Sequence, residues 1–392
     1  MTFSTRVPPT LQPNAVSRAV AALRAAGTSL IDLTESNPTR AGILYPPDLL
    51  SSLSDARGLS YRPDPLGLME TRTAVATDFA RRAITLRPEQ IALTASTSEA
   101  YSLLFKVLCD PGDEVLVPQP SYPLFEHLTR LDGVSSVPYL LEYHGRWSID
   151  LPSVQRALTP RTRALLVVNP NNPTGHFVSA ADLDALAAVC GPRGIAVISD
   201  EVFADYELAP ASEPRGVLAY RDDVLGFTLG GLSKSIGLPQ VKLGWIGVSG
   251  SRSDVRGALE RLELACDTYL SVSTPVQLAA PELMRRGADV RRQIQQRVRR
   301  NLASCVDAAS SSPACTVLHA EGGWYAVLRV PTLMAEEELM LRLLQEDAVL
   351  AHAGYFFDFP RESYLVLSLL PREETFAAGL TCILDRFRDV HA

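Results

Sequence analysis

Lysine is rare in this chain, and one lysine stands in a segment suited to nucleophilic chemistry. Lysine and arginine together number 37, of which only Lys106, Lys234 and Lys242 are lysines. Lys234 lies in the glycine- and serine-rich segment GGLSKSIGLPQVKLGW, residues 230–245. A desolvated lysine becomes a neutral amine that can form a Schiff base, whereas arginine keeps its proton. Lys242 offers a compact positive charge suited to phosphate, although an ordinary solvated loop would accommodate either lysine.

Two segments that follow expected strands carry hydroxyl and aromatic side chains. In TASTSEA, residues 94–100, hydroxyl groups stand where a helix is expected to begin, at Ser96, Thr97 and Ser98. The free N–H groups and the dipole of a helix N-terminus bind phosphate, although a serine cap needs no ligand. In PSYP, residues 120–123, Tyr122 is placed to stack on a planar ligand, with a packed turn as the alternative.

Two further segments place an amide and a carboxylate at strand ends. NPNNPTG, residues 169–175, follows a buried strand, and its Asn172 can offer an amide N–H to a ligand oxygen. ISDEVF, residues 198–203, closes another apolar strand with Asp200. A carboxylate there can pair with a protonated ring nitrogen and keep it charged. An ordinary turn and a helix-capping aspartate are the structural alternatives for these two segments.

These segments are spaced along an alternation of short apolar runs and helical patterns. Helices are expected at Ser98–Cys109 and Ala180–Cys190. Several of the apolar runs are continuous, as in strands that are covered on both faces. Six runs are expected as strands: Gln90–Leu93, Glu114–Pro118, Ala164–Asn169, Ala196–Asp200, Val224–Leu229 and Leu243–Val248. The alternation predicts a mainly parallel sheet in an α/β fold.

The pattern changes near residue 270, which predicts a second domain of the α+β class. Leu278–Ala308 predicts one or two long amphipathic helices, and Tyr364–Leu369 predicts a late strand. An amphipathic stretch, Ala15–Ala26, stands near the start of the chain. We expect three parts: residues 1–45, which pack with the C-terminal part or across a subunit boundary, a large domain at 46–270, and a small domain at 271–392.

Composition and charge limit the classes of function. The net charge is −7 and the charged residues form no block of like sign, so we expect no nucleic-acid-binding face. No apolar run approaches the ~18 residues of a membrane span, and the first residues lack the pattern of a signal peptide. The six cysteines lie far apart and the six histidines lack ligand spacing, which indicates a reduced, cytoplasmic protein without a metal site.

Together and in this order, the five chemical segments resemble the fold-type I aminotransferases of class I and II, the aspartate aminotransferase superfamily. The resemblance covers nearly the whole chain, from LTESNPT at 33–39 through YRPDPLG at 61–67 to GYFF at 354–357. Its most specific part is the order NNPTG, DE and SK, with about 30 residues between neighbours. It implies an enzyme that binds pyridoxal 5′-phosphate, with a mainly parallel sheet of the seven-stranded type in its large domain and a smaller α+β domain.

The resemblance also implies a role for each matching residue. Lys234 would hold the cofactor as a Schiff base and then move a proton at the substrate. Asp200 would pair with the pyridine nitrogen, Tyr122 would stack on the ring, and Asn172 would bind the 3-oxygen and the substrate carboxylate. The groups around the phosphate would be Ser96, Thr97, Ser98, Ser233 and Lys242. Tyr61 would reach the phosphate from a neighbouring subunit, which implies a homodimer with shared active sites.

The chain departs from the family pattern at positions that bear on the substrate. Phe203 stands beside the ring where the family usually has a tyrosine, so the Schiff base should be more basic. Val366 stands where the family has an arginine that clamps the substrate carboxylate. Arg40, which follows SNPT, is the first choice for a substitute arginine. The other arginines considered are Arg361 and Arg372.

Three functions follow from this resemblance. The leading one is transfer of an amino group between an amine or amino acid and a 2-oxo acid. The second is another pyridoxal phosphate reaction, namely β-elimination, decarboxylation or cyclisation, which the missing arginine keeps open. The third is a non-catalytic cofactor-binding protein, against which the joint presence of Lys234, Asp200 and Asn172 argues. The resemblance further implies cis peptide bonds at Asn172–Pro173 and Gln119–Pro120.

Overall fold

A sheet of eight strands forms the centre of the fold in this computed structural model, which describes residues 3–211, 213–361 and 363–388. The strands follow the order β2-β9-β8-β7-β6-β3-β4-β5. The neighbours from β8 through β7, β6 and β3 to β4 are parallel, whereas β9 is antiparallel to both β2 and β8. Their bounds are β2 Ile91–Thr94, β3 Glu114–Gln119, β4 Ser135–Tyr143, β5 Trp147–Ile149, β6 Thr162–Val168, β7 Ala196–Asp200, β8 Gly226–Gly231 and β9 Gly244–Ser249.

The mainly parallel sheet of the α/β prediction is therefore confirmed, with one strand more than the seven-stranded type. The three-residue strand β5 adds to β4 at the edge of the sheet and is antiparallel to it. The six expected strands were found with end shifts of at most two residues, and Ala196–Asp200 matches β7 at both ends, while β4 and β5 were missed. In β4, Ser135 and Pro138 interrupt the apolar pattern, because this strand lies near the edge, where proline is tolerated.

Helices cover both faces of the sheet, which explains the continuous apolar runs. Along β6, Leu166 and Val168 pack with the side chains of α3 (Thr97–Leu108) and α8 (Arg252–Tyr269). The alternate residues Leu165 and Val167 pack with α6 (Ala180–Cys190) on the other face. Because successive side chains of a strand point to opposite faces, the part of β6 between the helices, Ala164–Val168, is buried and apolar throughout.

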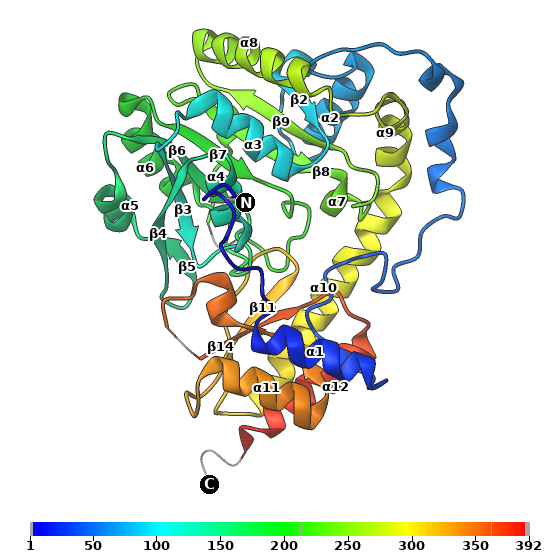
Figure 1. The fold of residues 1–392 in the computed structure, drawn as a ribbon, viewed down its shortest axis with the longest axis vertical. Coiled ribbons are helices and arrows are strands. Elements are labelled where there is room, and N and C mark those ends of the chain that lie inside the picture. The colour runs from blue at the N-terminus through cyan, green and yellow to red at the C-terminus, as the bar shows by residue number, and fades with distance from the viewer. Residues whose placement is uncertain (1–2, 212, 362, 389–392) are drawn as a thin grey trace.

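A second, antiparallel sheet follows the order β10-β11-β14-β13, and a parallel pair joins β1 to β12. The pair links Ile31 near the start of the chain to Val349 near its end. Figure 1 shows α1 in dark blue beside α11 and α12, at the end of the molecule away from β2 and β9. The strands are β1 Ile31–Asp32, β10 Thr316–Val317, β11 Tyr325–Arg329, β12 Val349–Leu350, β13 His352–Ala353 and β14 Tyr364–Ser368.

Among the remaining helices, α10 connects these two regions. The long helix α10, yellow in Figure 1, runs from the neighbourhood of α7 down to α12. Their bounds are α1 Ala15–Ala25, α2 Met69–Arg81, α4 Leu124–Leu131, α5 Leu151–Ala157, α7 Leu232–Ser235, α9 Thr274–Arg286, α10 Ala288–Ser310, α11 Glu336–Asp347 and α12 Glu373–Asp385. Within the described residues, no helix has the length and apolarity needed to cross a bilayer.

Both expected cis peptide bonds are confirmed. Gln119–Pro120 and Asn172–Pro173 are cis, and Asn169–Pro170 is a third cis bond that was not expected. All three lie at or just beyond the carboxyl ends of β3 and β6. They therefore shape the loops at the edge of the sheet where the sequence places its chemical segments.

Candidate active site

Lys234 lies on the single helical turn α7, between the antiparallel strands β8 and β9. Its amine nitrogen lies 5.0 Å from the ring centre of Trp324 and 5.5 Å from that of Phe203. Burial against these rings lowers the pKa of the Lys234 amine to about 8, and the negative charge of Asp200 opposes that shift. A substantial fraction of the amine is therefore neutral near pH 8, as a nucleophile requires.

Asp200 is the last residue of β7 and is buried. The hydroxyl of Tyr101 on α3 donates a hydrogen bond of 2.7 Å to its Oδ2, and the Val202 N–H donates one of 3.1 Å to its Oδ1. Burial raises the pKa of the Asp200 carboxyl, while these two hydrogen bonds and Lys234 lower it. The two donors hold the carboxylate in one orientation and leave it able to accept a further donor.

Asn172 and Tyr122 lie on the loops that follow β6 and β3. Asn172 is buried, and its Oδ1 has no hydrogen-bond partner among the described residues. Such an orphaned group is costly unless a ligand satisfies it. Tyr122 is about half exposed, and the pKa of its phenol is raised by burial and by the charge of Asp200. Both side chains are available to a ligand held between the two loops.

The start of α3 meets the start of β9 and forms a small polar cradle. Ser96 caps the helix by accepting a hydrogen bond of 3.1 Å from the Glu99 N–H, so the cap interpretation is confirmed for this residue. A Cβ at Gly244 would lie 3.0 Å from the Ser96 carbonyl carbon, which explains why only glycine fits there. Thr97 and Ser98 form the first turn of the helix, where N–H groups are free for an anion.

The two remaining residues expected at a phosphate flank this cradle. Ser233 lies on α7 beside Lys234 and is only partly buried. Lys242 is exposed, with a positive φ of 62°, immediately before β9. Its ammonium is thus free to move toward an anion at the start of α3.

Aromatic rings close the space beside Lys234. The ring of Trp324 packs against Phe203 and Tyr206, with ring centres 5.3 and 5.1 Å apart. Phe203 also packs against Tyr325, with ring centres 6.4 Å apart. Phe203 is buried and, having no hydroxyl, leaves the Lys234 amine without a phenol at this position. The phenol of the segment stands one turn later at Tyr206, which donates to the main-chain carbonyl of Lys234 instead.

The substrate side of the site has no arginine on β14. Val366 is fully buried in the core and pairs across the sheet with Val327 and His352. The segment that contains Arg40 is tied to β14, because the Ser368 hydroxyl donates a hydrogen bond of 2.7 Å to the Glu35 carbonyl.

The three arginines considered as substitutes for Val366 are all exposed. Arg40 has no ion pair with another described residue. Arg372 lies against Gly42, where its Nε would be 2.6 Å from a Cβ at that glycine. Arg361 lies between η6, the 3₁₀ turn Gly354–Phe357, and β14.

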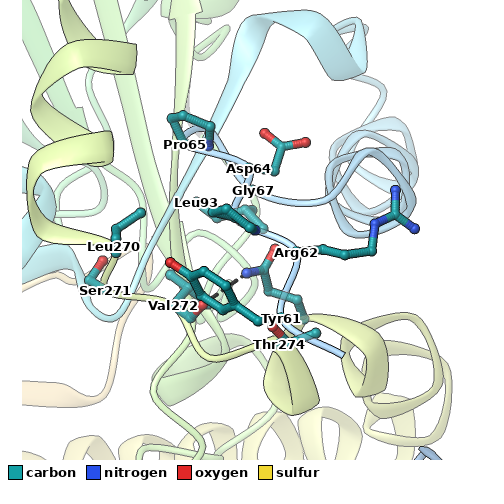
Figure 2. Close-up of a pocket in the computed structure, with 12 residues that line it drawn as sticks. Tyr61, Arg62, Asp64, Pro65, Gly67, Leu93, Leu270, Ser271, Val272 and Thr274 are labelled. Carbon is teal, nitrogen blue, oxygen red and sulfur yellow. Dashed lines mark hydrogen bonds between the residues drawn. The ribbon is translucent and has the colours of Figure 1, made fainter. Parts of the chain in front are cut away.

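Tyr61 lies on the segment that leads to α2. Figure 2 shows it lining a pocket with Arg62 and Asp64 from its own segment, Val272 from the segment before α9 and Thr274 at the start of α9. Tyr61 is 75% exposed, and its hydroxyl has no hydrogen-bond partner among the described residues.

Several residues near Lys234 were missed in the sequence. Tyr101 bonds Asp200, Trp324 forms part of the wall beside Lys234, and Tyr206 and Arg291 bond the main chain of the Lys234 turn. Tyr101 follows the TASTSEA segment directly, and its place on the buried face of α3 was the available signal. Arg291 gave no signal, because it is one of several arginines in α10, where arginine is the ordinary residue of a solvated helix face.

The donor set fits pyridoxal phosphate. A helix start with free N–H groups suits the phosphate, a buried and ionisable aspartate suits a protonated ring nitrogen, and a neutral amine suits the aldehyde. The orphaned Oδ1 of Asn172 lies on a loop beside them. Among the described residues, no group of three or more His, Cys, Asp and Glu side chains is arranged to bind a metal ion.

Comparison with known proteins identifies the family of the chain. The family model described as aminotransferase class I and II matches residues 28–375. An alanine aminotransferase of Mycobacterium tuberculosis is 27% identical over 390 residues, with 93% of this chain and 87% of the relative covered. The glutamate-pyruvate aminotransferase AlaA of Escherichia coli is 25% identical over 366 residues, with 91% and 89% covered.

Solved structures agree in fold. An alanine aminotransferase from Pyrococcus furiosus superposes with a TM-score of 0.87 at 24% identity, covering 99% of this chain and all of that one. A mutant of the Thermus thermophilus aspartate aminotransferase gives 0.83 at 24% identity, with 98% and 99% covered. Because the family model spans most of the sequence, the chain belongs to the class I and II aminotransferases of fold type I.

Proposed function

We propose that Lys234 is the residue through which this aminotransferase moves an amino group between an amine or amino acid and a 2-oxo acid. The observation that carries the proposal is the position of its amine, which is enclosed by Phe203 and Trp324 and has a pKa lowered to about 8. The other two lysines lack this environment. Lys106 is ion-paired with Asp132, and Lys242 is exposed.

The enzyme uses pyridoxal 5′-phosphate, the cofactor of its family, which when bound supplies an electron-withdrawing ring that stabilises negative charge at the substrate carbon. In our proposal Asp200 holds the ring nitrogen protonated, with Tyr101 keeping the carboxylate in place. Asn172 donates to the ring oxygen and Tyr122 covers a face of the ring. The neutral amine of Lys234 takes a proton from one carbon and returns it to another.

The phosphate is proposed to lie at the start of α3. Its ligands there would be the helix N–H groups, the hydroxyls of Ser96, Thr97, Ser98 and Ser233, and the ammonium of Lys242. The Gly244 contact with Ser96 supports this assignment, because it brings the segment of Lys242 against the helix start.

The names of the relatives favour amino-group transfer over β-elimination, decarboxylation or cyclisation. The two curated relatives are named for alanine and for glutamate and pyruvate. Such substrates carry an α-carboxylate, which needs a cationic partner in a site without an arginine at Val366. We propose Arg40 for this role, since it is exposed and free of ion pairs to described residues on a segment tied to β14.

A homodimer with shared active sites is part of the proposal. The surface around Tyr61 carries apolar side chains that one chain leaves exposed, among them Leu59 at 92%. Contact with a second copy would bury them, because exposed apolar surface of this kind favours association. In that arrangement Tyr61 donates its hydroxyl to the phosphate in the partner's site, which accounts for the exposure of Tyr61 in a single chain.

We also propose the division into a large domain at residues 46–270 and a small one at 271–392 joined by 1–45. The pairing of β1 with β12 supports the grouping of the first and last segments. A cytoplasmic location is proposed as well, and it is supported by six free cysteines.

Borohydride reduction of the purified enzyme, followed by peptide mass mapping, tests the central claim. The pyridoxyl group is expected on Lys234, and a transfer assay with a panel of amines and amino acids should identify the donor. Modification of Lys106 or Lys242 instead, or of no lysine, would reject the assignment.

A further inference from the structure

The helical turn that carries Lys234 is held by hydrogen bonds from both main chain and side chains. Within α7, the Leu232 carbonyl accepts from the Leu238 N–H at 2.9 Å and the Lys234 carbonyl accepts from the Gly237 N–H at 3.3 Å. Side chains from three distant segments add donors to the carbonyls of this turn and of the residues just after it. Tyr206 donates to the Lys234 carbonyl, Arg291 Nε donates to the Ser235 carbonyl at 2.9 Å, and Tyr45 donates to the Gly237 carbonyl at 2.6 Å.

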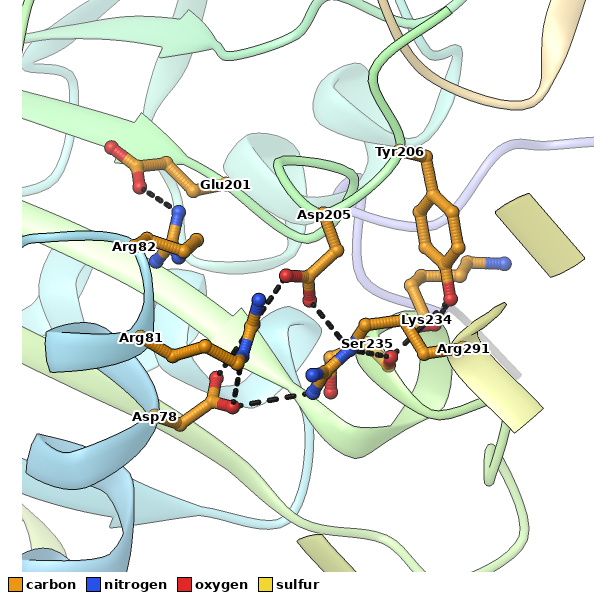
Figure 3. Close-up of polar contacts among 9 residues, drawn as sticks. All are labelled: Asp78, Arg81, Arg82, Glu201, Asp205, Tyr206, Lys234, Ser235 and Arg291. Carbon is orange, nitrogen blue, oxygen red and sulfur yellow. Dashed lines mark hydrogen bonds and ion pairs between the residues drawn. The ribbon is translucent and has the colours of Figure 1, made fainter. Parts of the chain in front are cut away.

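Arg291 is itself held by two carboxylates. Its Nη2 lies 3.2 Å from Asp78 Oδ1 on α2, and its Nε lies 3.4 Å from Asp205 Oδ2. The side chains of all three are 12% exposed or less. Figure 3 shows Arg291 between Asp78, Asp205 and the carbonyl of Ser235, while Arg81 contacts the same two carboxylates from α2. A guanidinium can hold several acceptors at once because its donors form a rigid planar fork.

This network also connects Lys234 with Asp200. Asp205 and Tyr206 lie on the turn that begins directly after β7, whose last residue is Asp200. Arg291 and Tyr206 therefore join the main chain that follows Lys234 to the main chain that follows Asp200. Tyr206 is fully buried against Trp324, so its hydroxyl has little freedom to move.

We propose that Arg291 is a positioning residue for amino-group transfer: it fixes the Lys234–Ser235 segment, with Tyr206, at a set distance from Asp200. The inference rests on the proposed role of Lys234. A lysine that must move a proton between two carbons needs a fixed attachment point, since small displacements of a reacting group are costly in rate.

Arg291 acts through the main chain rather than through its charge on the amine. Burial lowers the pKa of the Lys234 amine and the charge of Asp200 opposes that shift, whereas the contact of Arg291 with this turn is the hydrogen bond to the Ser235 carbonyl. Loss of Arg291 would let α7 move outward and expose the amine to water. Its pKa would then rise toward the ordinary value for lysine.

Three variants test the proposal against a matched control on the same helix. Arg291→Gln removes the fork and the charge. Arg291→Lys keeps a charge for Asp78 and Asp205 but offers only a single ammonium in place of the fork. Tyr206→Phe removes only the hydroxyl. The control is Arg292→Gln, because the Arg292 side chain is 64% exposed and pairs with Asp289 on the surface.

Two measurements separate positioning from general stability. The first is the single-turnover rate of the holoenzyme, which should fall about ten- to a hundredfold in Arg291→Gln and less in the two milder variants. The second uses the full-length protein without cofactor. The pH dependence of acetylation at Lys234 is read by peptide mass mapping, with Lys106 and Lys242 as internal references.

The pH midpoint for acetylation of Lys234 should be about 8 in the wild-type protein and in Arg292→Gln, and it should be higher in the Arg291 variants. Folded Arg291 variants with the rate and midpoint of the control would overturn the inference and leave the role of Lys234 intact. Unfolding of both Arg291 variants would assign Arg291 to stability alone and also overturn it. A wild-type protein that takes no cofactor on Lys234 refutes the proposed function instead.

Discussion

The hydroxyl of Tyr101 donates a hydrogen bond of 2.7 Å to Oδ2 of Asp200, and both groups are buried. The contact joins α3, whose start is the proposed phosphate site, to β7, whose last residue is Asp200. Burial raises the pKa of the Asp200 carboxyl, and the Tyr101 hydrogen bond counteracts that rise. Tyr101 therefore favours the ionised form of the buried Asp200 and opposes the effect of burial on its pKa.

Replacement of Tyr101 by phenylalanine should destabilise the cofactor-free protein more at high pH than at low pH. A carboxyl with a raised folded-state pKa stabilises the fold when protonated, and this contribution is lost as the pH rises through that pKa. Tyr101→Phe raises the pKa further, so the loss becomes larger once Asp200 must ionise. Urea unfolding at pH 5 and pH 8 should show a total cost of about 1.5–3 kcal/mol at the higher pH.

Tyr139→Phe is the matched control for this change. Tyr139 is equally buried, but its hydroxyl bonds the neutral carbonyl of Leu166 at 2.9 Å. Its cost should be about 1 kcal/mol and independent of pH. An equal pH dependence in the two variants would show that Tyr101 does not act on the ionisation of Asp200.

Lys234 should impose a stability cost on the cofactor-free protein at neutral pH. Its folded-state pKa of about 8 is below the ordinary value of about 10.4. The unfolded chain therefore binds more protons between these values, and stability rises with pH across that window. Lys234→Met should abolish transfer and raise the unfolding free energy at pH 7 by up to about 3 kcal/mol, with the gain vanishing above about pH 10.

Denaturant unfolding at pH 7 and above about pH 10 measures this gain, and Lys106→Met serves as its control. Lys106 is a surface lysine paired with Asp132, so its replacement should give no gain at pH 7. A Lys234→Met protein that is no more stable than the wild type at pH 7 would mean that the amine is better solvated than its contacts indicate.

Much of the fold could be predicted because the apolar runs have one physical cause. β6 and β7 are covered on both faces, and burial on both faces requires continuous apolar runs that can be recognised in the sequence. The edge strand β5 and its neighbour β4 lack this signal, because their burial patterns include partly buried or exposed residues. The parallel pairing of β1 with β12 joins residues more than 300 positions apart, and no local pattern encodes such a partner.

The site divides along similar lines. Lys234, Asp200 and Asn172 stand at strand ends within distinctive segments, so their residue types and order revealed them. Tyr206 and Arg291 donate hydrogen bonds to the carbonyls of α7. No residue type in the sequence indicates which side chain will bond a given main-chain carbonyl. Tyr101 resembles any aromatic residue on the buried face of a helix, and only the three-dimensional contact with Asp200 distinguishes it.

Phe203→Tyr should lower the pKa at which the absorption of the bound cofactor changes. A phenol at this position would lie beside Lys234, whose amine is 5.5 Å from the Phe203 ring, and would stabilise a negatively charged ring oxygen. We expect a decrease of about one pKa unit in a spectroscopic titration, equivalent to about 1.4 kcal/mol. Tyr325→Phe, a change at the neighbouring ring, should leave this pKa in place, and an unshifted pKa in Phe203→Tyr would place the ring oxygen elsewhere.

Arg40→Ala should weaken catalysis with substrates that carry an α-carboxylate. Val366 leaves β14 without a cation, and a carboxylate desolvated beside it would need a partner from another segment. Arg40 belongs to the segment whose Glu35 carbonyl accepts the Ser368 hydroxyl, so its side chain starts close to the end of β14. Loss of a charge-assisted pair predicts a fall of about a hundredfold in kcat/KM for such substrates.

Amines without a carboxylate should react equally well with the wild type and with Arg40→Ala, and Arg361→Ala should behave like the wild type. If kcat/KM for carboxylate substrates is unchanged, Arg40 is not the clamp, and the donor of this enzyme lacks the usual α-carboxylate.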